Sequence, residues 1–226
     1  MVRKDFAEES ESGSNGVFRD VSEQRNEEIL QSVCRSKEKK RSRKIAENKG
    51  ESIMCKIIAI ANQKGGVDKT TTTFNLGAAL ASQGKKVLLI DADPQGNLTT
   101  YMGWTEDEIP VTLNEVLLNT LSDKKTDFEK CIKHHNENLD LIPSDIQLSS
   151  IEMTLVGAMS REYTLRHSIQ SIKDQYDYIL IDTQPSLGML PINALACADK
   201  VIIPVQPQYL AAKGMTQLLS TIIKIR

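Results

Sequence analysis

The stretch IIAIANQKGGVDKTTTTFNLGAAL, residues 57–80, decides the fold. It opens with a short apolar run typical of a buried strand, passes through a glycine-bearing loop and ends in a helical pattern. Gly65 and Gly66 let the backbone approach an anion closely, so that its N–H groups and the helix N-terminus can hold phosphate. We therefore predict a phosphate-binding loop between a strand and a helix.

The alternation of strand and helix continues along the chain. Short apolar runs predict strands at residues 56–62, 86–91, 139–142, 178–182 and 200–205. Helical patterns cover residues 70–82, 112–121, 160–175 and 210–225. Continuously apolar strands suit a parallel sheet that is covered on both faces. The sequence thus predicts an α/β fold, doubly wound, with a mostly parallel sheet and helices on both faces.

The N-terminal part differs in composition from the rest. Residues 1–53 contain the acidic stretch EESESGSNG and the basic run RSKEKKRSRK at 35–44, with little apolar material to bury. We expect a disordered or loosely helical charged extension here, followed by one folded domain over residues 54–226. The basic run could neutralise nucleic-acid phosphates, but a solvated tail is the interpretation we favour.

Composition also points to a compartment. The four cysteines, at positions 34, 55, 131 and 197, form no CxxC pair, which is typical of reduced thiols in a cytoplasmic protein. The N-terminus has no apolar signal-peptide core, and no apolar run approaches the roughly 18 residues of a membrane span. We therefore expect a cytoplasmic protein without a membrane partner.

Three motifs at strand ends carry the chemistry. In an open parallel sheet, ligands bind beyond the carboxyl ends of the strands. Lys69 would reach the β- and γ-phosphates of a nucleotide, and the Thr70 hydroxyl would bind Mg²⁺. Asp91 and Asp93 follow one strand and Asp182 ends another, where carboxylates can order a magnesium ion or an attacking water. Each carboxylate alone is equally well explained as a turn residue.

These motifs resemble a known family. KGGVDKT is similar to the deviant Walker A motif KGGxGK[ST] of ParA/MinD-type P-loop ATPases. LLIDADPQGN, LIPSDIQLSSIE, YDYILIDTQPSLG and the segment from INALACADK to AAKGMTQLL resemble the ParA (Soj) branch in particular, so that the resemblance covers residues 56–226. It implies a P-loop NTPase fold of the deviant Walker A class, acting in chromosome or plasmid partition.

The resemblance also implies roles for individual residues. Lys64 matches the signature lysine that crosses to the partner subunit's phosphates, and Asp93 matches the residue linked to water activation. The loop that would hold ATP comprises Gly65, Gly66, Val67, Asp68, Lys69, Thr70 and Thr71. The Mg²⁺ ion would lie near Thr70, Asp91 and Asp182, the last of which matches the Walker B aspartate.

The family cycle sets expectations for partners. It implies a monomer without nucleotide and a homodimer with ATP. The dimer would bind non-specific DNA, associate with the nucleoid and release when a ParB-type protein stimulates hydrolysis. Iron–sulfur and tyrosine-kinase branches of the superfamily fit less well, because their cysteine pairs or tyrosine-rich tails are missing from these 226 residues. The MinD-like branch, which we also discount, is marked by a C-terminal membrane-seeking amphipathic helix that these residues do not test.

Two departures weigh against full activity. Asp68 stands where the family motif has glycine. Two like unit charges about 4 Å apart repel by about 4 kcal/mol at an effective dielectric constant of about 20, roughly a thousandfold in affinity. The position would also require φ > 0 if the family backbone is kept. The sequence stops at residue 226, before the family's C-terminal part. The alternative hypothesis is therefore a nucleotide-incompetent interaction module or an inactive fragment.

Two weaker candidates complete the set. His134 and His135 have no third ligand at metal-binding spacing, so we expect an exposed loop there and no metal site. Met153 and Met159 are expected to fill the core.

Overall fold

The computed structural model describes residues 54–206 and 209–225. The expected N-terminal extension, with its basic run at 35–44 and Cys34, lies outside the described residues. The division into an extension and one domain therefore stays a prediction.

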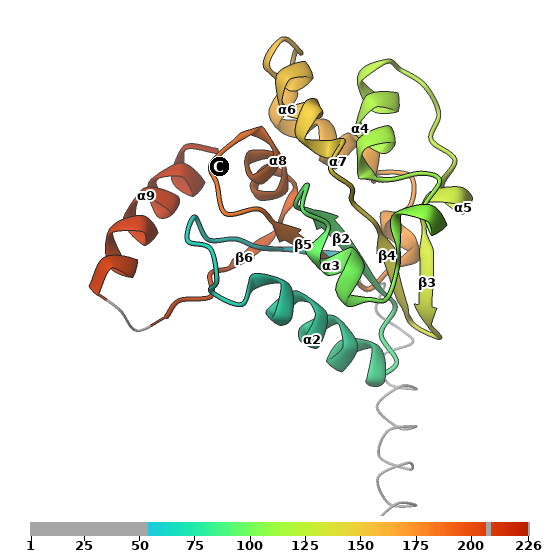
Figure 1. Cartoon of the computed structure of the whole chain (residues 1–226), viewed down its shortest axis with the longest axis horizontal. Helices are drawn as coiled ribbons and strands as arrows, with labels where there is room; N and C mark the ends of the chain where they lie inside the picture. The colour runs from blue at the N-terminus through green and yellow to red at the C-terminus, as the bar shows by residue number, and fades with distance from the viewer. Residues whose placement is uncertain (1–53, 207–208, 226) are drawn as a thin grey trace, which may run out of the picture. The chain divides into compact units, whose positions relative to one another are not determined.

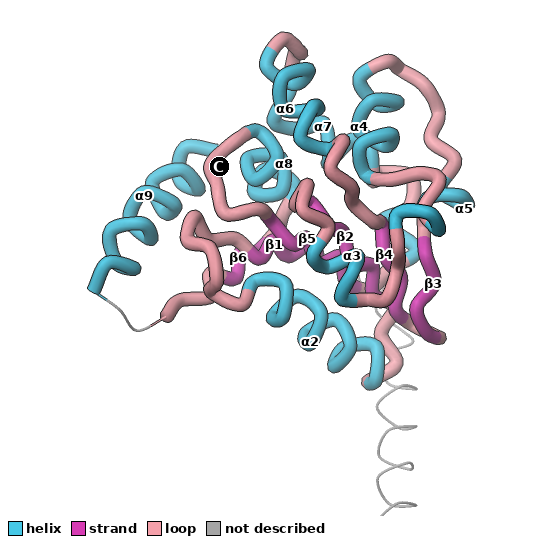
Figure 2. Tube along the Cα trace, viewed as in Figure 1, coloured by secondary structure: helices cyan, strands magenta, loops and turns pink. Residues whose placement is uncertain are grey.

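The core of the domain is a six-stranded sheet in the order β3-β4-β2-β5-β1-β6 (Figure 2). Its strands are β1 (Lys56–Ile60), β2 (Val87–Ala92), β3 (Lys133–Asn136), β4 (Leu139–Ile142), β5 (Tyr178–Thr183) and β6 (Lys200–Ile202). All neighbouring strands pair in parallel except β3 with β4. The predicted α/β fold with a mostly parallel sheet is confirmed.

Helices cover both faces of the sheet (Figure 1). They are α2 (Lys69–Ser82), α3 (Asn97–Tyr101), η2 (Glu106–Glu108), α4 (Leu113–Leu121), α5 (Phe128–Cys131), α6 (Leu148–Val156), η3 (Arg161–Tyr163), α7 (Thr164–Ser168), η4 (Lys173–Gln175), α8 (Met189–Cys197) and α9 (Tyr209–Ile225). Helix α2 lies on one face, and α4, α7 and α8 lie on the other. Within the described ranges, no helix has the length and hydrophobicity needed to cross a bilayer.

The alternation of side chains along the strands builds two cores. In β2, Leu88 and Ile90 pack toward α4 and α8, whereas Val87 and Leu89 pack toward α2. Helix α2 lies close to the sheet at Gly77, where an added Cβ would come within 2.7 Å of the Leu89 side chain. This packing orients α2 so that its N-terminus faces the carboxyl ends of the strands.

One predicted helix is wrong in extent. Residues 160–175 form η3, α7 and η4 instead of one continuous helix. Ser160 adopts a left-handed conformation at φ 50°, and the Leu165 N–H is taken by the Asn193 side chain at 3.0 Å. After α7, the chain turns through i→i−3 bonds such as Ile172 N to Ile169 O. Side-chain contacts from α8 thus break a pattern that looks helical locally.

The two weaker candidates are corrected as well. The segment around His134 is the edge strand β3, not a loop, and His134 contacts Asp140 on β4 at 2.6 Å. No group of three potential metal ligands occurs among the described residues. Met153 and Met159 are 83% and 96% exposed, so they are not core residues. Helix α6 packs instead through Leu148, Ile151 and Leu155, all fully buried.

Candidate nucleotide-binding site

The phosphate-binding loop predicted from the sequence connects β1 to α2. Gly65 and Gly66 are exposed at its tip, and Gly66 has φ 67°, a conformation that glycine adopts without strain. A Cβ at either glycine would meet no atom within 4 Å, so the space beside the loop is open. Val67 is buried beneath it. The loop therefore presents bare backbone at the N-terminus of a 14-residue helix.

Lys69 is the first residue of α2 and is 8% exposed. Its Nζ donates a hydrogen bond to the backbone oxygen of Lys64 at 3.3 Å, which folds the side chain back along the loop. Burial lowers the pKa of Lys69, while the carboxylates of Asp182 and Asp93 act in the opposite direction. Within the described residues this partly desolvated ammonium donates one hydrogen bond, to Lys64 O, and its other N–H groups can take phosphate oxygens as acceptors.

Thr70 and Asp182 meet across the gap between α2 and β5. The Thr70 hydroxyl donates to Asp182 Oδ2 at 2.6 Å, and Thr73 donates to Oδ1 at 3.3 Å. Burial raises the pKa of Asp182 to about 6, against the hydrogen bond from Thr70 and the Lys69 ammonium. A hydroxyl and a carboxylate placed together are hard oxygen donors of the kind that Mg²⁺ binds.

Asp91 lies beside Asp182, since the two residues are register partners on β2 and β5. Its Oδ2 accepts hydrogen bonds from the backbone N–H and the hydroxyl of Thr99 at 2.9 and 2.8 Å. Complete burial and the neighbouring Asp182 raise the pKa of Asp91 to about 7. Both oxygens of Asp91 are already hydrogen-bonded, because Oδ1 accepts from Asp93 N. It is better placed to support the site than to bind a metal directly.

The two predicted catalytic residues lie on the loops above the strand ends. Asp93 is 7% exposed and accepts from the Gln95 N–H at 2.9 Å. Lys64 donates from Nζ to Gln206 Oε1 at 3.2 Å, and Gln206 Nε2 donates to Gly66 O at 2.7 Å. The structure thus brings the segment after β6 against the phosphate-binding loop.

Two predicted positions contribute no side chain to this cluster. Thr71 is exposed, on the solvent side of α2. Asp68 is also exposed and makes no side-chain cap to the helix. Three residues of the cluster were not predicted as site residues: Thr73, Thr99 and Gln206.

The geometry agrees with comparisons to known proteins. A family model described as AAA domain, AAA_31, matches residues 55–226. The chain belongs to this AAA-domain family. Its relatives include the sporulation initiation inhibitor protein Soj of Bacillus subtilis, 49% identical over 170 residues, which are 75% of this chain and 65% of Soj. The chromosome partitioning protein ParA of Caulobacter vibrioides is 44% identical over 173 residues, 76% of this chain and 63% of that protein.

The resemblance to ParA and Soj is therefore confirmed. The chain spans less than two thirds of the length of these two curated relatives.

Two solved structures similar to this chain hold nucleotides. Cobyrinic acid a,c-diamide synthase from Mycobacterium smegmatis, with bound ADP and magnesium, aligns with a TM-score of 0.70 at 41% identity, over 76% of this chain and 68% of that one. A plasmid partition protein from Borrelia burgdorferi, bound to AMPPNP, aligns with a TM-score of 0.66 at 34% identity, over 75% and 70%. These ligands agree with the ATP and Mg²⁺ predicted from the sequence.

At position 68 this AAA-domain chain has aspartate, where the family motif has glycine. The residue has φ 59° and ψ 33°, so the predicted requirement for φ > 0 is confirmed. Aspartate tolerates this left-handed region better than most residues. Its carboxylate forms no ion pair with Lys69 in the described part of the chain, and it is exposed. Solvent and salt screen an exposed charge, so the repulsion of a triphosphate falls below the about 4 kcal/mol expected from the sequence.

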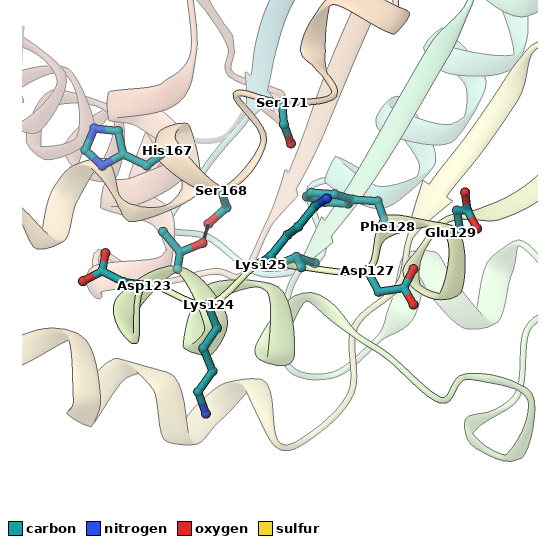
Figure 3. A pocket seen from close by; sticks show the side chains of 11 residues that line it. Asp123, Lys124, Lys125, Asp127, Phe128, Glu129, His167, Ser168 and Ser171 are labelled. Atoms are coloured by element: carbon teal, nitrogen blue, oxygen red, sulfur yellow. Dashed lines mark hydrogen bonds between the residues drawn. The ribbon is translucent and has the colours of Figure 1, made fainter.

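A cavity of about 770 Å³ lies away from the strand ends, between the C-terminus of α4, the 123–127 loop and α7 (Figure 3). Lys124 and Lys125 share its lining with Asp123, Asp127 and Glu129. None of the residues predicted to bind nucleotide lines it, so it is not part of the candidate site.

Proposed function

We propose that this domain is a ParA-type ATPase of chromosome or plasmid partition. The observation that carries the proposal is the hydrogen bond between Thr70 and Asp182, with the Lys69 ammonium beside the same carboxylate. The phosphate-binding loop, the hydroxyl at the helix start and the acidic strand end are then in one place. That combination supports binding of a nucleoside triphosphate with Mg²⁺.

The loop would hold the triphosphate from below. Backbone N–H groups of Gly65, Gly66 and the residues up to Thr71 would bind phosphate oxygens, and Lys69 would leave the Lys64 carbonyl for the β- and γ-phosphates. Thr70 and Asp182 would hold Mg²⁺, with Asp91 fixing the second strand end. Two protein oxygens suffice, because Mg²⁺ keeps several waters and phosphate oxygens. The ion would neutralise charge on the transferring phosphoryl group.

Hydrolysis would use residues from two loops. Asp93 would orient the attacking water, and Lys64 would place positive charge at the γ-phosphate of a partner subunit. For this role Lys64 must leave Gln206, which holds its Nζ in the present conformation. We therefore propose an ATP-dependent homodimer that binds non-specific DNA and is released by a ParB-type protein. The similarity to a chromosome partitioning protein supports a role in partition.

A second function follows from Asp68. A carboxylate at the helix start, in a position where the motif has glycine, favours a nucleotide-incompetent module that binds partners but does not switch. The two functions differ in one measurable property, which is the affinity for Mg²⁺-ATP.

Phosphate release tests the first function. We expect slow Mg²⁺-dependent hydrolysis by the chain, faster hydrolysis by Asp68→Gly, and loss of more than about 90% of either rate with Lys69→Ala or Asp93→Ala. If Asp68→Gly gives no hydrolysis above background, or if Lys69→Ala leaves the rate unchanged, the assignment is wrong.

A further inference from the structure

The chain that follows β6 runs alongside the phosphate-binding loop. Ala61 N donates to Ile202 O at 3.0 Å, which continues the pairing of β1 with β6 beyond the end of β1. Asn62, 7% exposed, donates from Nδ2 to Pro204 O at 2.7 Å, and its Oδ1 accepts from Lys64 N at 3.0 Å. The residues that lead away from β6 are therefore bound to the beginning of the loop.

Gln206 follows in the same segment and bridges two groups of the loop with one side chain. Its Oε1 accepts from Lys64 Nζ at 3.2 Å, and its Nε2 donates to Gly66 O at 2.7 Å. An ammonium can only donate and a carbonyl oxygen can only accept, so the two partners fix which way the amide is turned. Glutamine fits this position because its amide carries an acceptor and a donor together.

The bridge holds Lys64 on its own loop. Under the proposed function, on which this inference rests, the same ammonium has to reach the nucleotide of a partner subunit. Its bond to Gln206 must therefore break before the dimer can form. We propose that Gln206 is a positioning residue that retains Lys64 in the monomer and thereby opposes formation of the homodimer.

The size of the effect follows from the symmetry of a homodimer. When only a fraction of the monomers has the binding-competent conformation, the apparent affinity falls by that fraction. A homodimer uses Lys64 of both subunits, so the fraction enters twice. If the bond to Gln206 leaves about a third of the monomers competent, its removal tightens the dimer about tenfold.

A purely structural role of Gln206 predicts a different result. Its bond to Gly66 O would then serve only to shape the loop, at an exposed glycine with φ 67°. In that case a substitution of Gln206 would weaken nucleotide binding by the monomer and would not tighten the dimer. The sign of the change in dimer affinity therefore separates the two roles.

The test is the dimer dissociation constant of the whole chain carrying Asp68→Gly, measured by analytical ultracentrifugation at saturating AMPPNP and Mg²⁺. Gln206→Ala should tighten the dimer about tenfold. Gln206→Glu should weaken it several-fold, because a carboxylate holds an ammonium more strongly than an amide oxygen does. Gln83→Ala, which replaces an exposed glutamine at the other end of α2, should change nothing. Equal affinities in Gln206→Ala and the parent, or changes of the same sign with alanine and glutamate, would overturn the inference.

A second readout needs no nucleotide. Limited acetylation of the chain with acetic anhydride, followed by mass spectrometry, measures how readily Lys64 reacts relative to the exposed Lys86. Gln206→Ala should raise this ratio several-fold and Gln206→Glu should lower it, because alanine removes an acceptor of the ammonium and the carboxylate strengthens it. The same ratio in both variants and the parent would contradict the bridge. If none of the proteins dimerises with nucleotide, the proposed function is wrong and the control of dimerisation falls with it, whereas the ratio still tests the bridge itself.

Discussion

Asp91 is buried beside a second carboxylate, and this has a consequence for stability. Its pKa is raised from the ordinary value of 3.8 to about 7, first by burial and then by Asp182. Between these pH values the folded state keeps a proton that the unfolded state has lost. Stability is therefore highest below the unfolded pKa and falls as the pH rises toward 7. Asp182, with a pKa of about 6, acts in the same direction.

We expect the free energy of unfolding of the chain, without nucleotide or Mg²⁺, to fall between pH 5 and pH 7. Asp91→Asn should flatten this fall by on the order of 2 kcal/mol, because the group no longer titrates. Urea unfolding at several pH values in EDTA measures the slope. The control is Asp123→Asn, an exposed carboxylate at φ 53° where asparagine is tolerated. A slope that is the same in both variants and in the parent would refute the explanation.

The sequence alone was enough to predict the site residues that lie at the ends of recognisable strands and helices. Lys69, Thr70 and Asp182 lie at the ends of a strand and a helix that are visible as patterns, so their meeting follows from the fold class. Gln206 could not be found in this way. Its bonds to Lys64 and Gly66 span about 140 residues and depend on where the chain after β6 runs. Thr99 lies only eight residues after Asp91, and its contact with Asp91 depends on how the chain turns from β2 into α3.

At the scale of elements, Glu152 connects α6 to the loop that follows Asp182. Its Oε1 accepts from Gln184 Nε2 at 3.0 Å and from Leu190 N at 3.3 Å. Gly188 lies so close that an added Cβ would collide with the same carboxylate. The contact fixes the loop between β5 and α8 against α6.

We expect Glu152→Ala to lower the free energy of unfolding by about 1–3 kcal/mol, because two donors lose their acceptor. Glu152→Gln keeps an oxygen at the same place and should cost less than half as much. Chemical denaturation of both variants measures the difference. If alanine and glutamine have equal effects, the hydrogen bonds are not the reason.

On the exposed face of α6, by contrast, we expect a substitution to leave the free energy of unfolding almost unchanged. Met153 lies 83% exposed, so Met153→Ser should change the free energy of unfolding by no more than about 0.5 kcal/mol. Leu155→Ser, two residues further on and fully buried, is the matched contrast and should cost several times more. A large loss of stability in Met153→Ser would contradict the exposed placement and would indicate a core position, as the sequence predicts for this methionine.

Elements with strong apolar periodicity were predicted well, and short ones were not. The strand at 139–142 and the helix beginning near residue 70 lie where the sequence places them. The edge strand β3 is exposed and polar, so it carries no apolar alternation that would reveal it. The break at residues 160–175 arises from Asn193 on α8, which no local window contains.

At the scale of the whole molecule, we expect nucleotide binding at the candidate site to control the oligomeric state. In our account, dimerisation requires a bound triphosphate and the trans contact of Lys64. We expect light scattering to show a monomer without nucleotide and, for Asp68→Gly with AMPPNP and Mg²⁺, a shift toward a dimer. The shift should be lost in Asp68→Gly combined with Lys64→Ala. A dimer that forms equally well without nucleotide would contradict the proposed switch.

The central claim is that the strand ends form a nucleotide site that Asp68 weakens. The most direct measurement is equilibrium binding of a fluorescent ATP analogue with Mg²⁺ to the chain, to Asp68→Gly and to Asp68→Asn. We predict about ten- to hundredfold tighter binding by the glycine variant, because exposure screens part of the repulsion. The asparagine variant should recover most of this gain if charge is the cause. Equal affinity of all three proteins, or no binding even by Asp68→Gly, would contradict the account.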